Sequence, residues 1–130
     1  MSPNLPFDNL YRHGFARVAV AVPRCRVADP AFNGPQTLAL WREAERRGAC
    51  LVAFPELGLS AYTCDDLFHQ RALLDACEAA LAQVLAASET CTAVAVVGLP
   101  LRVDHSLFNC AAVVHRGRLL DDVERGRDFR

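Results

Sequence analysis

Residues 51–68 read LVAFPELGLSAYTCDDLF, and the order of apolar and charged residues in this stretch decides the fold. The apolar run over residues 50–54 predicts a buried strand. Glu56 follows directly after Pro55, whose ring fixes its own φ and biases the preceding residue towards an extended backbone. Ligands of open α/β sheets bind beyond the carboxyl ends of the parallel strands, so Glu56 has the position of a site residue that could act as a general base. Capping of the next turn, or an ion pair with an arginine, is the alternative role for this carboxylate.

Strands and helices alternate on both sides of this stretch. Residues 15–22 (FARVAVAV) hold one charge among apolar residues and predict a strand buried on both faces, whereas residues 23–35 predict a loop. Apolar residues recur at helical spacing over residues 36–47 and 72–87, and Gly48 ends the first of these patterns. The remaining apolar runs predict strands over residues 93–98, 110–114 and 118–123, with a hairpin turn over residues 115–117.

The order β, α, β, α, β followed by a β-hairpin predicts an α/β fold. Helical crossovers join parallel strands and the hairpin adds antiparallel ones, so the sheet should be mixed. At 130 residues the chain is one domain at most. Residues 121–130 (DDVERGRDFR) differ in composition from the rest and are predicted to form a divergent, charged tail that is exposed or frayed.

The composition excludes several classes of function. The 14 basic and 15 acidic residues nearly balance, so no surface for nucleic acid or an anionic membrane is expected. No apolar run reaches the roughly 18 residues that cross a bilayer, and no secretory signal precedes the first strand, so we expect a cytoplasmic protein. There is no glycine-rich phosphate loop, and neither ATP nor a dinucleotide should bind this chain.

Cysteines and a short acidic segment are the remaining candidates for special chemistry. The six cysteines lie mostly inside apolar runs and are predicted to be buried free thiols rather than a disulfide scaffold. Cys64, Asp65, Asp66 and His69 are close enough along the chain to suggest a metal site. An ion pair between an aspartate and His69 at helical spacing is the favoured interpretation, and no metal site is expected.

Several motifs resemble one enzyme superfamily. FPEL at residues 54–57, followed by LSAY at residues 59–62, resembles the first catalytic motif of the nitrilase (carbon-nitrogen hydrolase) superfamily. The extension TCDDLF, the leader YRHGF at residues 11–15 and the segment LFNCAAVVHRGRLL at residues 107–120 are similar to the glutaminase domain of glutamine-dependent NAD(+) synthetases. The resemblance covers roughly residues 7–120, in the same order as the strands and helices predicted above.

The resemblance implies a fold and two site residues. The fold would be a partial nitrilase-like α-β-β-α sandwich, of which this chain forms the first half. The family's glutaminase site uses a glutamate, a lysine and a cysteine: the glutamate takes the thiol proton, the thiolate attacks the amide of glutamine, and the lysine stabilises the oxyanion. Carried over by motif, Glu56 is the general base. Tyr62 falls where an aromatic residue forms a wall of the glutamine pocket, with plain packing as its alternative role.

The resemblance also implies partners and cofactors. Ammonia released from glutamine passes to a separate synthetase domain, which amidates an ATP-activated nicotinic acid adenine dinucleotide. ATP and Mg would belong to that domain, so no cofactor is expected in this chain. The synthetases that the chain resembles assemble into homo-oligomers.

The sequence departs from the family pattern at the other two catalytic positions. All 14 basic residues are arginines. Arg125 stands near the expected lysine position, but a planar guanidinium differs from an ammonium in shape and donors, and we interpret the match as a coincidence of register. The nucleophilic cysteine is expected beyond residue 130, and Cys64 is interpreted as a structural thiol. The chain is therefore predicted to be inactive by itself and to expose a face or edge of its sheet.

Two other functions remain open on the sequence alone. One is a fragment of a generic amidase or carbamoylase of the same superfamily, because the features that select the substrate lie outside the Glu56 motif. The other is a non-catalytic α/β module that binds or assembles with another protein.

Overall fold

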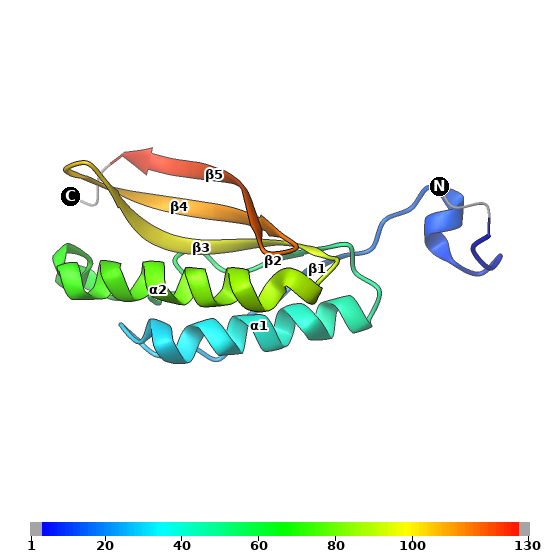
Figure 1. The fold of residues 1–130 in the computed structure, drawn as a ribbon, viewed down its shortest axis with the longest axis horizontal. Helices are drawn as coiled ribbons and strands as arrows, with labels where there is room; N and C mark the ends of the chain where they lie inside the picture. Colours follow the sequence, from blue (N-terminus) through cyan, green and yellow to red (C-terminus); the bar gives the residue numbers. More distant parts are fainter. Residues whose placement is uncertain (1–3, 128–130) are drawn as a thin grey trace.

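The computed structural model describes residues 4–127, and it describes side chains for residues 4–120. Its elements, drawn in Figure 1, are η1 (Leu10–His13), β1 (Val18–Val20), α1 (Pro30–Arg46), β2 (Leu51–Ala53), η2 (Asp65–His69), α2 (Arg71–Ala87), η3 (Ser88–Thr90), β3 (Val94–Val103), β4 (Ser106–His115) and β5 (Arg118–Arg127). Within residues 4–127, no helix has both the length and the apolar character needed to cross a bilayer.

One mixed sheet contains all five strands in the order β1-β2-β3-β4-β5. The first three strands are parallel and the last two are antiparallel, as predicted. The turn between β4 and β5 has positive φ at both Arg116 (48°) and Gly117 (76°), which is the geometry of a type I′ hairpin. The long hairpin between β3 and β4 was not predicted, because its turn at residues 104–105 lacks a glycine or proline signal.

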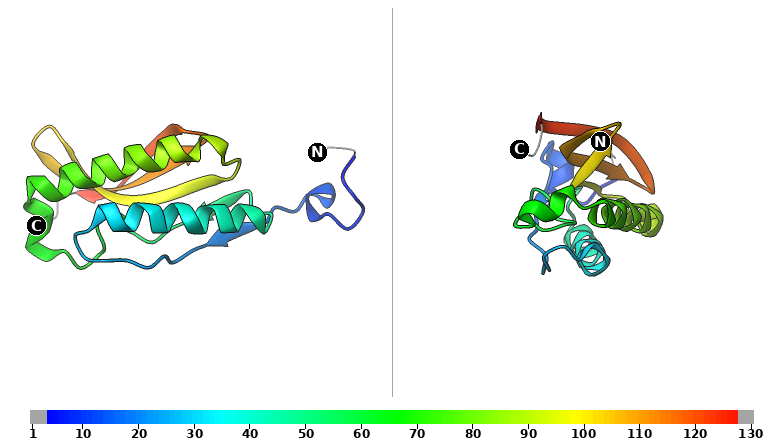
Figure 2. Two further views of the ribbon diagram at one scale, coloured as in Figure 1. Left: turned by 60° about the horizontal axis from the view of Figure 1, so that its bottom comes forward. Right: turned by 90° about the vertical axis from the view of Figure 1, so that its left-hand side faces the viewer.

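Helices α1 and α2 lie side by side on one face of the sheet, as the views in Figure 2 show. The core forms between these helices and the sheet. Trp41 of α1 is fully buried, and its indole N–H donates to the Ala93 carbonyl at 3.1 Å. Leu81 and Val84 of α2 pack in the same cluster. The apolar faces of α1 and α2, which the sequence pattern predicted, therefore pack against the same face of the sheet.

The opposite face of the sheet carries no helix in the described part of the chain. Strand β1 lies at one edge, and its residues Val18 and Val20 are 63% and 83% exposed. Ala19, which alternates with them, packs against the core. The prediction that this strand is buried on both faces was wrong, because the helices cover only one face and β1 is three residues long.

Helix α1 begins at Pro30, six residues before the predicted start. The Asp29 side chain accepts a hydrogen bond from the Phe32 N–H at 3.2 Å, and Pro30 occupies the first helical position, where a missing N–H costs nothing. Pro35 lies inside the helix and leaves the Ala31 carbonyl without its usual partner, but Ala31 is exposed to solvent. The loop prediction was therefore wrong for residues 30–35.

The charged segment at the end of the chain continues β5 through Arg127. Its backbone pairs with β4, with Cys110 opposite Glu124 and Phe108 opposite Arg127. The backbone of residues 121–127 is therefore paired rather than frayed. Residues 128–130 of the predicted tail, and the side chains of residues 121–127, including that of Arg125, lie outside the described residues. The prediction of a tail relied on the low hydrophobicity of this segment. Strands pair through their backbone N–H and C=O groups, so a segment of low hydrophobicity can still join a sheet. Charged side chains are also common on edge strands.

All six cysteines are free thiols, as predicted, but only four of them are buried. Cys25 and Cys50 are exposed. Burial, with smaller contributions from Cys64 and Glu78, raises the pKa of Cys77 to about 12. The thiolate is the reactive form, so the buried thiols should be protected from alkylation.

We expect iodoacetamide to modify two thiols of the native chain, Cys25 and Cys50, and all six after unfolding. Mass spectrometry of peptides from chain alkylated with and without denaturant measures this pattern. Cys25 should be slow for an exposed thiol at neutral pH, because partial burial and the nearby Cys64 raise its pKa. Rapid modification of Cys77 in the native chain would contradict the packing described above.

Candidate active site

Glu56 lies in a tight turn that follows the carboxyl end of β2. The N–H of Phe54 still donates to the Val96 carbonyl of β3 at 3.0 Å, so the strand direction continues up to Pro55. Leu57 then has a left-handed φ of 53°, and the Gly58 N–H donates back to the Pro55 carbonyl at 3.2 Å. A non-glycine residue in this region is uncommon, and such strain is typical of functional sites. The turn places Glu56 at the strand exit predicted from the sequence.

The turn passes directly over β3 at Gly98. The Leu59 N–H donates to the Gly98 carbonyl at 3.1 Å. A Cβ atom at position 98 would lie 2.6 Å from the Leu57 nitrogen and 2.7 Å from the Pro55 oxygen. Both neighbours are backbone atoms, so the close approach requires glycine at this position.

A buried amide ties the segment after Glu56 to helix α1. Asn33, which is 1% exposed, donates to the Leu59 carbonyl at 2.9 Å and to the Arg26 carbonyl at 2.8 Å. Its oxygen accepts from the Arg26 N–H at 2.7 Å. One side chain thus joins the loop after β1, the first turns of α1 and the loop after β2. These bonds hold the segment that directly follows the Glu56 turn.

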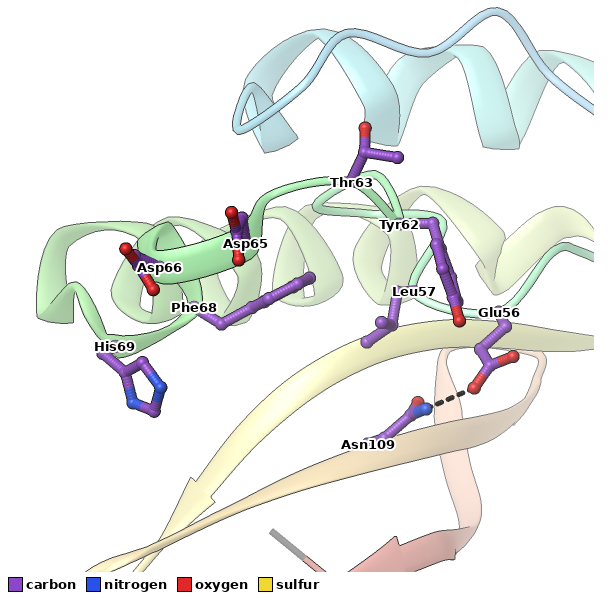
Figure 3. Close-up of a pocket in the computed structure, with 9 residues that line it drawn as sticks. All are labelled: Glu56, Leu57, Tyr62, Thr63, Asp65, Asp66, Phe68, His69 and Asn109. Carbon is purple, nitrogen blue, oxygen red and sulfur yellow. Dashed lines mark hydrogen bonds between the residues drawn. The ribbon is translucent and has the colours of Figure 1, made fainter. Parts of the chain in front are cut away.

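The Glu56 carboxylate is half-buried and contacts β4. The Asn109 side-chain amide donates to Glu56 Oε1 at 2.5 Å (Figure 3). Sequence reasoning assigned no role to Asn109, although it noted the surrounding LFN segment. The available signal was alternation along β4: Asn109 shares the face of Ala111 and Val113, where a polar side chain interrupts an apolar series.

An open pocket of about 540 Å³ lies beside this pair of side chains. Its lining residues, shown in Figure 3, are Glu56, Leu57, Tyr62, Thr63, Asp65, Asp66, Phe68, His69 and Asn109. A second pocket of about 320 Å³, formed largely by the loops after β1 and β2, is also lined by Glu56 and Tyr62. Glu56 therefore borders both of these pockets, which a small polar substrate could enter.

The family of the chain follows from a comparison of its whole sequence. The family model described as carbon-nitrogen hydrolase matches residues 17–129. The chain belongs to the carbon-nitrogen hydrolase family. Glu56 and its turn lie within the matched region, as do Gly98 and Asn109.

Curated relatives of this carbon-nitrogen hydrolase chain are much longer proteins. The glutamine-dependent NAD(+) synthetase of Mycobacterium tuberculosis is 42% identical over 119 residues, which are 92% of this chain and 18% of the synthetase. The enzyme of the same name from Mycobacterium leprae is 37% identical over 116 residues, or 89% of this chain and 17% of that protein. The chain thus spans less than a fifth of the length of these relatives.

Solved structures of the family share the fold. A glutamine-dependent NAD(+) synthetase from Cytophaga hutchinsonii aligns with a TM-score of 0.77 at 22% identity, covering 85% of this chain and 19% of that one. A mutant amidase of the nitrilase superfamily from Nesterenkonia aligns with a TM-score of 0.72 at 21% identity, covering 85% of this chain and 42% of the amidase. The predicted nitrilase-like α/β fold with a mixed sheet is confirmed.

The structure places the two site residues predicted for this carbon-nitrogen hydrolase chain beside the same cavities. Tyr62 lies in the loop after the Glu56 turn and is 65% exposed. It shares both pockets with Glu56, and Figure 3 shows its ring extending from the loop towards the carboxylate. Tyr62 is not packed in the core, and its role as a wall of a glutamine pocket stays a prediction.

The remaining candidates near Glu56 do not form a reactive group in the described part of the chain. Cys64 is 2% exposed, and its thiol donates to the Ser60 carbonyl at 3.0 Å, as expected of a structural thiol. Among the described side chains, no ion pair joins His69 to Asp65 or Asp66. That predicted pair was wrong, because the segment is a short 3-10 helix that starts from a left-handed Asp65. Residues 4–120 contain no group of three side chains that could hold a metal ion.

Proposed function

We propose that this chain is the N-terminal part of a glutamine amidohydrolase domain that supplies ammonia for NAD(+) synthesis from nicotinic acid adenine dinucleotide. The single observation that carries the proposal is the placement of Glu56, constrained by its turn and by Asn109 at the mouth of a pocket. The names of the curated relatives at 37% to 42% identity support the glutamine-dependent reaction over a generic amide hydrolysis.

In this proposal Glu56 performs the proton transfers of a thiol-dependent amidase. Its carboxylate takes the proton of a cysteine thiol as the thiolate attacks the side-chain amide carbon of glutamine. The proton then passes to the leaving nitrogen, the C–N bond breaks, and ammonia departs. Water, deprotonated by the same carboxylate, hydrolyses the resulting thioester to glutamate. An ammonium group would stabilise the oxyanion formed in each step.

The chain itself supports only part of this cycle. It contains no lysine, and Cys64, the cysteine that follows the Glu56 turn, is buried and bonded to a backbone carbonyl. We therefore propose that this chain alone is inactive and that the ammonium and the thiol come from a separate stretch of polypeptide. In that arrangement this chain contributes the general base and one wall of the substrate pocket.

A chimera tests the proposed function. In the Mycobacterium tuberculosis synthetase, the matching segment is replaced by the 119 residues of this chain that align with it. We expect the chimera to release glutamate from glutamine and to lose at least about 10³-fold in rate on Glu56→Gln. NAD(+) synthesis from free ammonia is the control for an intact synthetase part. A chimera that uses ammonia but does not hydrolyse glutamine would contradict the proposal.

The isolated chain provides the complementary measurement. Incubation with glutamine should release no more glutamate than the Glu56→Gln variant releases. A rate above that of the variant would show that the chain is active alone. A cooperative thermal transition together with a stable monomer would instead favour a self-sufficient binding module, whereas aggregation or loss of fixed packing would favour an incomplete domain.

A further inference from the structure

We infer that Asn109 is a positioning residue that holds the Glu56 carboxylate in its working orientation. The catalytic part of this inference rests on the proposed function, in which Glu56 is the general base. The contact itself is a property of the fold and can be tested without any activity. Asn109 belongs to β4, whereas Glu56 follows β2, 53 residues earlier in the chain.

The contact crosses an intervening strand. Strand β3 lies between β2 and β4, so a side chain after β2 must pass over β3 to reach β4. The backbone of residues 55–57 crosses β3 at Gly98, where no side chain stands in the way. A small cavity of about 180 Å³ is lined by Glu56, Gly98, Asn109 and Ala111. The register of β3 and β4 places Gly98, Asn109 and Ala111 on the same face of the sheet. The lack of a Cβ at Gly98 thus lets the turn approach β3 closely enough for Glu56 to reach Asn109.

The arrangement has the properties of a positioning contact. A glutamate side chain has three rotatable bonds, and a general base must be aimed at the proton it takes. An amide N–H binds a carboxylate more strongly than it binds a neutral acceptor, so Asn109 is suited to hold the carboxylate in one orientation. Asn109 pairs with Pro100 of β3 in an uninterrupted antiparallel register, although the pairing of β4 with β5 shifts register between Phe108 and Cys110. Sites supported by strands are more precise than sites supported by loops.

Nuclear magnetic resonance of the full 130-residue chain tests the contact directly. The side-chain amide signals of Asn109 should shift in Glu56→Gln, because the substitution replaces the charged acceptor of its hydrogen bond with a neutral amide. Asn33 is the matched control, because its amide bonds to backbone carbonyls and should not respond to Glu56→Gln. Asn109 signals that are unchanged in Glu56→Gln would overturn the inference.

Kinetics of the chimera test the catalytic role. Asn109→Asp keeps the shape of the side chain and removes the donor, and Asn109→Ala removes the whole amide. Both should lower kcat for glutamine hydrolysis by about 10- to 100-fold while KM changes less than about 3-fold, because the contact orients a reacting group without holding substrate. Asn9→Asp, far from the pocket in the N-terminal segment, should leave both constants unchanged.

The two measurements separate the inference from the function on which it rests. An active chimera whose folded Asn109 variants keep their full kcat would overturn the positioning role and leave the proposed function standing. An inactive parent chimera that still uses ammonia would overturn the function, and the resonance experiment would still decide whether Asn109 holds Glu56.

Discussion

Replacing Gly98 with alanine is expected to lower the free energy of unfolding by about 2 kcal/mol and to displace the turn that carries Glu56. The new Cβ would meet the Leu57 nitrogen at 2.6 Å and the Pro55 oxygen at 2.7 Å. Both are backbone atoms, so neither can rotate away as a flexible side chain would. The turn must lift off β3, which weakens the bond from the Leu59 N–H to the Gly98 carbonyl and withdraws Glu56 from Asn109.

Gly34→Ala is the matched control for Gly98→Ala. Gly34 lies inside α1, and the nearest atom to its added Cβ would be the Ala80 Cβ at 3.6 Å, an ordinary contact. Alanine has a higher helix propensity than glycine, so this variant should gain about 1 kcal/mol. Urea unfolding of both variants gives the two differences. Equal effects, or a Gly98→Ala variant as stable as the parent, would show that the turn does not press on β3.

The same substitution should reduce glutamine hydrolysis in the chimera. A displacement of a catalytic group by about 1 Å can cost about 100-fold in rate. We expect a loss of that size in kcat for Gly98→Ala, with synthesis from free ammonia retained. Gly34→Ala should leave both reactions near the parent rates.

Asn33→Asp is expected to destabilise the chain by about 3 kcal/mol at neutral pH. The Asn33 amide donates to the carbonyls of Arg26 and Leu59 from a position that is 1% exposed. A carboxylate has the same shape but no hydrogen to donate, so its charge would face two carbonyl oxygens without water. The loop after β2 would lose its link to α1, although the N–H of Arg26 could still bond to the new side chain.

The pH dependence of Asn33→Asp provides a second check. Burial and the two carbonyls should raise the pKa of the introduced carboxyl above its value in the unfolded chain, about 3.9. The folded variant then binds a proton more tightly than the unfolded one, so its stability falls as pH rises above about 4. Unfolding midpoints at pH 4 and pH 7, compared with those of the parent chain, measure this. Asn9→Asp is the control, because that side chain only accepts a bond from the Tyr11 N–H and a carboxylate does so equally well.

Local patterns predicted most of the elements because their causes are neighbours in the chain. Pro55 and the apolar run before it predicted the strand exit at Glu56, and the spacing of apolar residues predicted α2 to within one residue at its start. Prediction from local sequence failed where the same residue type is compatible with two different structures. Proline can begin a helix or break one, so the start of α1 at Pro30 was read as a loop.

Burial was harder to predict than secondary structure. A run such as FARVAVAV suits a strand covered on both faces, yet Val18 and Val20 are exposed because helices cover only one face of the sheet. The charged segment after Leu120 suits a tail, yet its backbone pairs with β4. In both cases the outcome depends on neighbouring layers and strands, which composition does not describe.

By itself the sequence determined the order of strands and helices, the turn that carries Glu56 and the resemblance to the carbon-nitrogen hydrolases, because proline, glycine and hydrophobic periodicity act within a few residues. Only the tertiary structure decided what the carboxylate contacts. The bond between Glu56 and Asn109 joins residues 53 positions apart. It depends on the order of three strands and on the missing side chain at Gly98, and neither can be read from the residues next to Glu56.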